Sequence, residues 1–204
     1  MTNEMRAFLK HAFDRVRGSV AGTVTVATLG PAETSSACVA HRVVRTVAAS
    51  DEVRLFETFE GAATHVVNDS RALLLVPNAY ASLNTFHFDT RLRLAGCFMH
   101  PIPRYGIARR PGNSVSAGAQ ITVATHPAPI SMAKDFAARF AGSRIILTPS
   151  TAAAAESAAN GTTDYCVTNA VAVAAYGLQF VSAPRNVVMG WSLFSARRRN
   201  DAGE

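Results

Sequence analysis

VATLGPAETSS, residues 26–36, is the stretch from which the fold of this chain is best deduced. The apolar, β-branched run that begins at Val24 is typical of a short buried strand, and Gly30-Pro31 ends it. The hydroxyl residues 34–36 follow, and side chains of this type favour a helix start. Backbone N–H groups and the helix dipole attract anions at such a point. The stretch therefore predicts a carboxylate or phosphate site at the end of a strand.

Strand and helix patterns alternate along most of the chain. Strands are predicted at 24–29, 53–56, 72–76, 121–125, 144–147, 165–167, 178–181 and 187–195. Helices are predicted at 34–44, 60–67, 129–140, 150–159 and 169–176. Such alternation implies parallel strands joined by helical crossovers, and hence an α/β fold with mainly parallel sheets.

The segment 91–110 differs, because Pro101 and Pro103 join what we interpret as two separate extended stretches. Proline-rich joints of this kind often mark the passage from one lobe to another. We predict residues 1–18 as an N-terminal amphipathic helix, 19–95 with 178–204 as lobe 1, and 96–177 as lobe 2. The apolar face of the N-terminal helix has two expected partners, the body of the protein or a second subunit in a homodimer.

The charge of the chain favours a small anionic ligand. With 20 Lys and Arg against 14 Asp and Glu, the formal net charge is +6. The single dense run, Arg197 to Arg199, stands at the C-terminal tail, and no RNA-binding or zinc-finger signature accompanies it. We therefore expect no nucleic-acid partner and attribute the positive balance to attraction of a small anion.

Cysteine usage and hydropathy suggest a cytoplasmic protein. The three cysteines are widely spaced and form no CxxC pair, which argues against a disulfide framework and a structural zinc site. No stretch is long and apolar enough to span a bilayer, and charged residues stand where a signal peptide needs an apolar core. We expect no membrane partner, no metal and no cofactor, since Walker, GxGxxG and HExxH patterns are absent too.

Polar side chains stand at several predicted strand-to-helix junctions. They are Thr34, Ser35 and Ser36, then His126, then Ser150 and Thr151, and then Thr168 and Asn169. Each of them alone is explained more simply as a helix cap. Together they would lie at the carboxyl edges of parallel sheets, where ligands bind. Two lobes with facing edges would form a cleft suited to a small polyanion.

Few other groups are candidates for chemistry. His126 ends a predicted strand and is a candidate proton donor, although a histidine bonded into its own turn is the alternative. Tyr80 and Tyr105 could donate hydrogen bonds, and tyrosines also fill interfaces between lobes. Ser192 alternates with Trp191 along a strand, so one of these two is expected to face the ligand.

Five motifs occur in order along the chain: LGPAETSS (29–36), THPAPI (125–130), STAAAA (150–155), DYCVTNAVAVAAYGLQFV (164–181) and WSLF (191–194). Together they resemble the prephenate dehydratase superfamily, and within it most closely the bacilysin-type prephenate decarboxylases. The resemblance implies a two-lobed fold like that of type II periplasmic binding proteins. Prephenate would then lie in the cleft between the lobes, with no cofactor.

The chain departs from the dehydratase pattern in several places. Where dehydratases carry Thr-Arg-Phe, with the threonine linked to loss of the ring hydroxyl, this chain has Ser192-Leu193-Phe194. Where they carry Glu-Asn-Ser, it has Asn78-Ala79-Tyr80, and Glu33 replaces the usual glycine. Because the chain ends soon after Phe194, we expect it to lack the regulatory phenylalanine-binding domain that commonly follows in dehydratases.

These departures suggest decarboxylation of prephenate without aromatisation, giving a dihydro-4-hydroxyphenylpyruvate for an antibiotic or other secondary metabolite. His126, Tyr80 and Ser192 are the predicted catalytic residues, and the sequence leaves open whether His126 or Tyr80 is the proton donor. The predicted substrate-binding residues are Thr34, Ser35, Ser36, Asn78, Tyr105, Ser150, Thr151, Thr168 and Asn169. The alternatives are a prephenate dehydratase that forms phenylpyruvate and a non-catalytic two-lobed binding protein.

Overall fold

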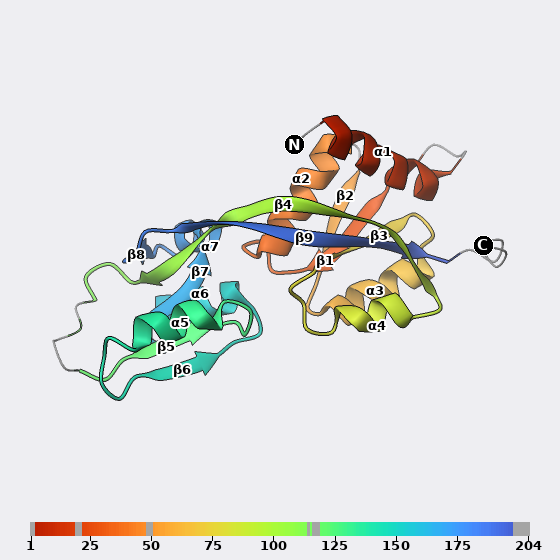
Figure 1. Cartoon of the computed structure of the whole chain (residues 1–204). Helices are drawn as coiled ribbons and strands as arrows, with labels where there is room; N and C mark the ends of the chain where they lie inside the picture. The colour runs from red at the N-terminus through yellow and green to blue at the C-terminus, as the bar shows by residue number, and fades with distance from the viewer. Residues whose placement is uncertain (1–2, 19–21, 48–50, 114, 116–118, 198–204) are drawn as a thin grey trace. The chain divides into compact units, whose positions relative to one another are not determined.

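The structure is a computed structural model that describes residues 3–18, 22–47, 51–113, 115 and 119–197. It divides into two compact units, which are described separately. Unit 1 consists of Met1–Ala32, Ser36–Pro101 and Val188–Glu204, and unit 2 consists of Glu33–Ser35 and Ile102–Val187. The chain passes between the units within two long strands, β4 (Leu92–Arg109) and β9 (Arg185–Ala196) (Figure 1).

Unit 1 is built on a sheet with the strand order β2-β1-β3-β9-β4. Strands β1 (Thr25–Leu29), β2 (Glu52–Phe56) and β3 (Ala72–Pro77) are parallel, and β9 runs antiparallel to β3. The helices are α1 (Asn3–Arg17), α2 (Ser35–Val47), α3 (Phe59–Asn68) and α4 (Leu83–Phe88). Figure 1 shows α1 and α2 on one face of this sheet and α3 and α4 on the other.

Burial on both faces explains why the strands of unit 1 are apolar without alternation. All of Ala72 to Val76 is buried, as expected for a central strand covered by helices on both sides. On one face, Leu74 and Val76 pack with Phe59 and Phe86 of α3 and α4 and with Phe194 of β9. The amphipathic pattern of the helices therefore follows from the two-sided sheet.

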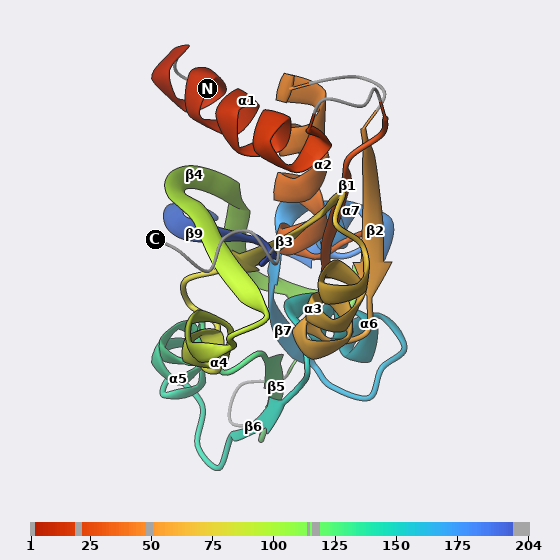
Figure 2. The same cartoon turned by 90° about the vertical axis from the view of Figure 1, so that its right-hand side faces the viewer.

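Helix α1 packs on unit 1, one of the two placements expected for its apolar face. Its buried residues are Leu9, Ala12, Phe13 and Val16, and Figure 2 shows it next to α2. Phe8 lies over Gly96 of β4, where a Cβ atom would overlap the Phe8 ring. This close approach explains the glycine at position 96.

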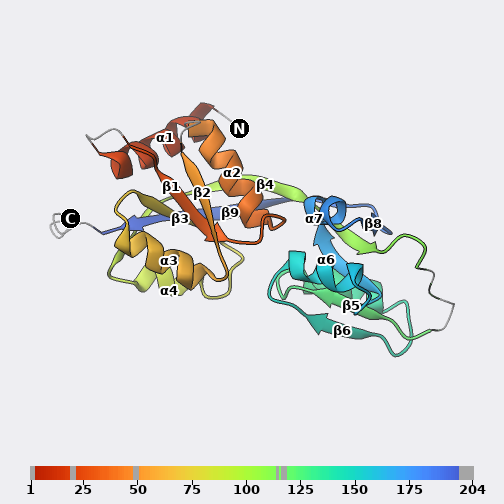
Figure 3. The same ribbon diagram turned by 180° about the vertical axis from the view of Figure 1, so that it is seen from behind.

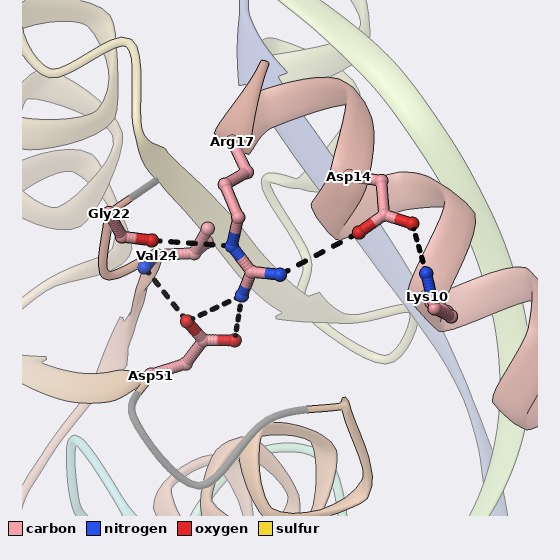
Figure 4. A network of polar contacts seen from close by, with 6 residues as sticks. All are labelled: Lys10, Asp14, Arg17, Gly22, Val24 and Asp51. Carbon is pink, nitrogen blue, oxygen red and sulfur yellow. Dashed lines mark hydrogen bonds and ion pairs between the residues drawn. The ribbon is translucent and has the colours of Figure 1, made fainter. Parts of the chain in front are cut away.

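A buried ion pair fastens the C-terminal end of α1 (Figure 4). Arg17 Nη2 lies 2.8 Å from both Oδ1 and Oδ2 of Asp51, a carboxylate with no exposed surface, and Arg17 Nε donates to the Gly22 carbonyl at 3.2 Å. Val24 N also donates to Asp51 Oδ1, at 3.0 Å. These contacts link α1 to the start of β1 and the residue before β2. The Lys10–Asp14 pair in the same figure is exposed.

Unit 2 contains the strand order β4-β7-β5-β6, with β8 (Gln179–Phe180) paired to β4. Strand β5 (Thr122–Thr125) is parallel to β6 (Arg144–Leu147) and β7 (Tyr165–Asn169). The helices are α5 (Ile130–Ala137), α6 (Thr151–Ala159) and α7 (Ala170–Ala175).

Helices α5 and α6 cover opposite faces of the unit 2 sheet. Phe136 of α5 packs edge-on against Tyr165 of β7, with ring centroids 4.9 Å apart. The neighbouring β7 residue, Cys166, packs instead with the alanines of α6, among them Ala154 and Ala158. Figure 3 shows α6 close to β5 and β7. Since successive strand residues point to opposite faces, the two helices lie on the two sides of this sheet.

One expectation about the chain was wrong. Pro101 and Pro103 do not separate two extended stretches, because both lie within the continuous strand β4. The fixed φ of proline lies at the edge of the broad β region and proline lacks the N–H donor, so a strand can contain it where that donor is not needed. The structure also contains a short helix that was not predicted, α4, since no glycine marks its end as Gly177 marks the end of α7.

Candidate functional site

The carboxyl edge of the unit 2 sheet gathers several of the predicted binding residues. Strands β5, β6 and β7 end at Thr125, Leu147 and Asn169, and each is followed by a turn or a helix start. The Tyr105 cluster, as we name Ser35, Tyr105, Thr151 and Asn169, lies at this edge. In the register of β4 and β7, Tyr105 is paired with Asn169.

A chain of hydroxyl groups forms the centre of the Tyr105 cluster. Tyr105 Oη lies 2.7 Å from Ser35 Oγ and 3.2 Å from Thr151 Oγ1. These residues come from the start of α2, from β4 and from the start of α6, so they are distant in sequence. Hydroxyl groups both donate and accept, and their hydrogens can turn toward a bound anion.

Asn169 connects the start of α7 to the backbone at Glu33. Its Oδ1 caps α7 by accepting from Val171 N at 2.8 Å and Ala172 N at 3.0 Å. Its Nδ2 donates to the Glu33 carbonyl at 2.9 Å. Asn169 thereby fixes the backbone just before Ser35, and Thr34 beside it is buried. Thr168 is fully buried, and its hydroxyl donates to the Thr151 carbonyl at 2.8 Å.

Ser150 and His126 both contact only their neighbours in sequence: Ser150 as a helix cap, and His126 as a histidine bonded into its own turn. Ser150 is the N-cap of α6, since its Oγ accepts from Ala153 N at 3.0 Å. His126 Nδ1 accepts from Ala128 N at 3.2 Å, which leaves the neutral ring with its hydrogen on Nε2. Burial lowers the pKa of His126 below its ordinary value of 6.5, so the neutral ring is favoured at neutral pH.

In unit 1, Asn78 and Ser192 form a hydrogen-bonded pair where β3 and β9 meet. Ser192 Oγ donates to Asn78 Oδ1 at 2.8 Å, and Asn78 N donates to the Gly190 carbonyl at 2.8 Å. Cys97 Sγ, from β4, lies 3.4 Å from Ser192 Oγ. Cys97 was not predicted as a site residue, because no motif surrounds it and 95 residues separate it from Ser192.

Tyr80 belongs to unit 1 but not to this pair. Its Oη donates to Glu60 Oε1 at 2.7 Å, and its ring packs on Phe59 at 4.7 Å between centroids. Burial, and next the hydrogen bond to Glu60, raise the pKa of Tyr80 above 10.0, so the phenol keeps its proton at neutral pH. The sequence analysis did not select Glu60 either.

Ser36, the last of the predicted binding residues, is buried in α2 and belongs to unit 1.

Two further kinds of site can be judged from geometry and hydropathy. Across the described ranges, no three His, Cys, Asp or Glu side chains gather as a metal site requires. Among the described helices, none has both the length and the hydropathy needed to cross a membrane.

The chain is similar in sequence to curated prephenate decarboxylases, although no protein-family model matches it. It is 30% identical over 189 residues to the prephenate decarboxylase of Bacillus subtilis, covering 90% of this chain and 92% of that protein. It is 33% identical over 178 residues to the prephenate decarboxylase of Planktothrix agardhii, covering 84% of this chain and 88% of that protein.

Solved structures with the same fold are more distant in sequence. The prephenate dehydratase of Arthrobacter aurescens has a TM-score of 0.64 at 18% identity, over 86% of this chain and 61% of that one. A periplasmic VFT2 domain of Bordetella pertussis BvgS has a TM-score of 0.52 at 15% identity, over 99% and 89%. These likenesses confirm the predicted α/β, two-lobed fold of the periplasmic-binding-protein type.

Proposed function

The chain belongs to the prephenate decarboxylase family, and on that premise we propose that it decarboxylates prephenate without making the ring aromatic. The C–C bond to the ring carboxylate breaks, carbon dioxide leaves, and the electron pair enters the ring. One proton then adds to a ring carbon, and the ring hydroxyl stays in place. The product is a dihydro-4-hydroxyphenylpyruvate.

The observation that carries this proposal is the Tyr105 cluster. Three motifs of the sequence meet there, since Ser35 follows the first strand, Thr151 starts α6 and Asn169 ends β7. Neutral hydroxyl donors near a helix start suit a carboxylate, which accepts several hydrogen bonds. We propose that the cluster binds one carboxylate of prephenate and thereby orients the substrate. The net charge of +6 helps to attract this dianion.

Retention of the ring hydroxyl is supported by the Asn78–Ser192 pair. Dehydration requires a proton on the departing hydroxyl, and by its resemblance to the dehydratases this chain has Ser192 where they carry the threonine of Thr-Arg-Phe. A serine hydroxyl has one hydrogen, and that of Ser192 is donated to Asn78 Oδ1. We propose that this hydroxyl gives no proton to the substrate, so the alcohol does not leave.

Tyr80 is the proton donor that the electrostatics favour. A phenol carries its proton at neutral pH, and because Tyr80 is only partly buried its hydrogen can turn from Glu60 Oε1 toward a substrate, where a ring carbanion is basic enough to remove it. His126 is held neutral, and a neutral imidazole is a poor acid. We therefore expect Tyr80→Phe to lower kcat about 100-fold or more, the typical range for loss of a general acid, and His126→Gln to lower it much less.

The direct test is incubation of the purified protein with prephenate in deuterated water, followed by NMR and ultraviolet absorbance. The expected product is non-aromatic, keeps its hydroxyl and carries one deuterium on the ring. Formation of aromatic phenylpyruvate would identify a dehydratase instead. Binding of prephenate without turnover would identify a binding protein. The cytoplasmic location and a role in antibiotic or other secondary metabolism stay predictions from the sequence.

A further inference from the structure

We propose that Cys97 is a positioning residue that directs the hydroxyl hydrogen of Ser192 toward Asn78. By doing so, Cys97 would keep the enzyme from dehydrating its substrate. This inference rests on the proposed decarboxylation and concerns only how the alternative product is avoided. All three residues belong to unit 1.

Counting hydrogens fixes the direction of the two contacts. Asn78 Oδ1 only accepts, so Ser192 must donate its single hydrogen in the 2.8 Å contact. In the 3.4 Å contact between Cys97 Sγ and Ser192 Oγ, the thiol is then the donor. The order is Cys97 to Ser192 to Asn78, and each donor strengthens the next bond in such a chain.

Asn78 is itself held in place as the end of this chain. Its backbone N–H donates to the Gly190 carbonyl at 2.8 Å. Its side chain lies over Gly190, where a Cβ atom would come within 2.6 Å of Asn78 Nδ2. Any larger residue at position 190 would displace the amide. The acceptor for Ser192 is thus fixed by the backbone of β9.

The surroundings of Ser192 make the thiol contact important. Ser192 is almost fully buried, whereas Cys97 is exposed. While Cys97 donates, a lone pair of Ser192 Oγ is occupied and the hydroxyl is restrained from turning. When that donor is removed, the hydroxyl can rotate and offer its hydrogen elsewhere. If it protonates the substrate's alcohol, the C–O bond breaks and water departs, the C–C bond to the carboxylate breaks and carbon dioxide leaves, and the ring becomes aromatic; Ser192 then regains a proton from solvent.

The test compares product ratios in Cys97→Ala, Cys97→Ser and Met99→Ala. Cys97→Ser keeps a donor at this position, and Met99→Ala is a matched control because Met99 is an exposed residue of the same strand. We expect Cys97→Ala to raise the ratio of phenylpyruvate to non-aromatic product about fivefold, as for loss of one neutral hydrogen bond. Cys97→Ser should return the ratio to within about twofold of the unmodified protein, and Met99→Ala should leave it unchanged.

The outcomes separate this inference from the proposed function. If Cys97→Ala keeps the product ratio, the inference is wrong, even when kcat falls or KM rises. If Met99→Ala changes the ratio as much as Cys97→Ala, the effect belongs to the strand and the inference is also wrong. If the unmodified protein yields no non-aromatic product at all, it is the proposed function that fails.

Discussion

Arg17→Met should destabilise unit 1 strongly, although Arg17 is not among the predicted site residues. The substitution leaves the buried Asp51 carboxylate with a single remaining donor among those described above, Val24 N at 3.0 Å. It also removes the 3.2 Å bond from Arg17 Nε to the Gly22 carbonyl. Removing one partner of a buried ion pair costs about 3–5 kcal/mol, because the other charge is left uncompensated.

The partial exposure of Arg17 determines where in the range of about 3–5 kcal/mol the loss of stability should lie. The Arg17 side chain is 24% exposed while that of Asp51 is 0% exposed, so some water can reach the vacated space. We therefore expect the lower end, a loss of about 3 kcal/mol in the free energy of unfolding. With a urea slope of about 2 kcal/mol per molar, the unfolding midpoint should fall by about 1.5 M.

The assay is urea unfolding followed by the fluorescence of Trp191, the single tryptophan of the chain. Trp191 is fully buried and lies in unit 1, so its emission reports on the unit that contains the ion pair. Lys10→Met is the matched control, because Lys10 pairs with Asp14 at the surface of the same helix and exposed pairs contribute little. A midpoint for Arg17→Met no lower than that for Lys10→Met would refute the reasoning.

Three further outcomes are expected. Tyr105→Phe should lower kcat/KM for prephenate about 30-fold and the free energy of unfolding by about 1–3 kcal/mol, because two hydroxyl contacts are lost, whereas Tyr176→Phe should match the unmodified protein. The NMR titration midpoint of His126 should lie below pH 6.5. Because the unfolded chain takes up this proton first, His126 should destabilise the fold as pH falls below about 6.5, and His126→Gln should remove that slope. Gly96→Ala should lower the unfolding midpoint because its Cβ overlaps the Phe8 ring, and adding Phe8→Ala should recover part of the loss.

Local patterns were sufficient for most of the fold. Strand β6, Arg144–Leu147, begins and ends as predicted, because the apolar run is bounded by turn residues. Asn169 was predicted at a helix start and is the N-cap of α7. These features depend on neighbours in sequence, which is the range that periodicity and capping rules cover.

The site was less accessible to sequence reasoning. Tyr105 was selected as a possible hydrogen-bond donor, but only the pairing of β4 with β7 places it near Asn169. Cys97 and Glu60 were missed because their partners, Ser192 and Tyr80, are brought to them by strand order and by packing. Contacts of this kind leave no local signal, since a single exposed cysteine or glutamate looks like any surface residue.

Strand β9 has a consequence for how the protein is made. It lies between β3 and β4 in unit 1 but follows all of unit 2 in the chain. A nascent chain leaving the ribosome therefore has every strand of unit 2 available while β3 and β4 still lack their shared neighbour. In most proteins the N-terminal part folds first. Here unit 2 would be able to complete its sheet before unit 1 does, although most of unit 1 is synthesised earlier. Until β9 is synthesised, the open strand edges of unit 1 would be the part of the molecule most exposed to aggregation.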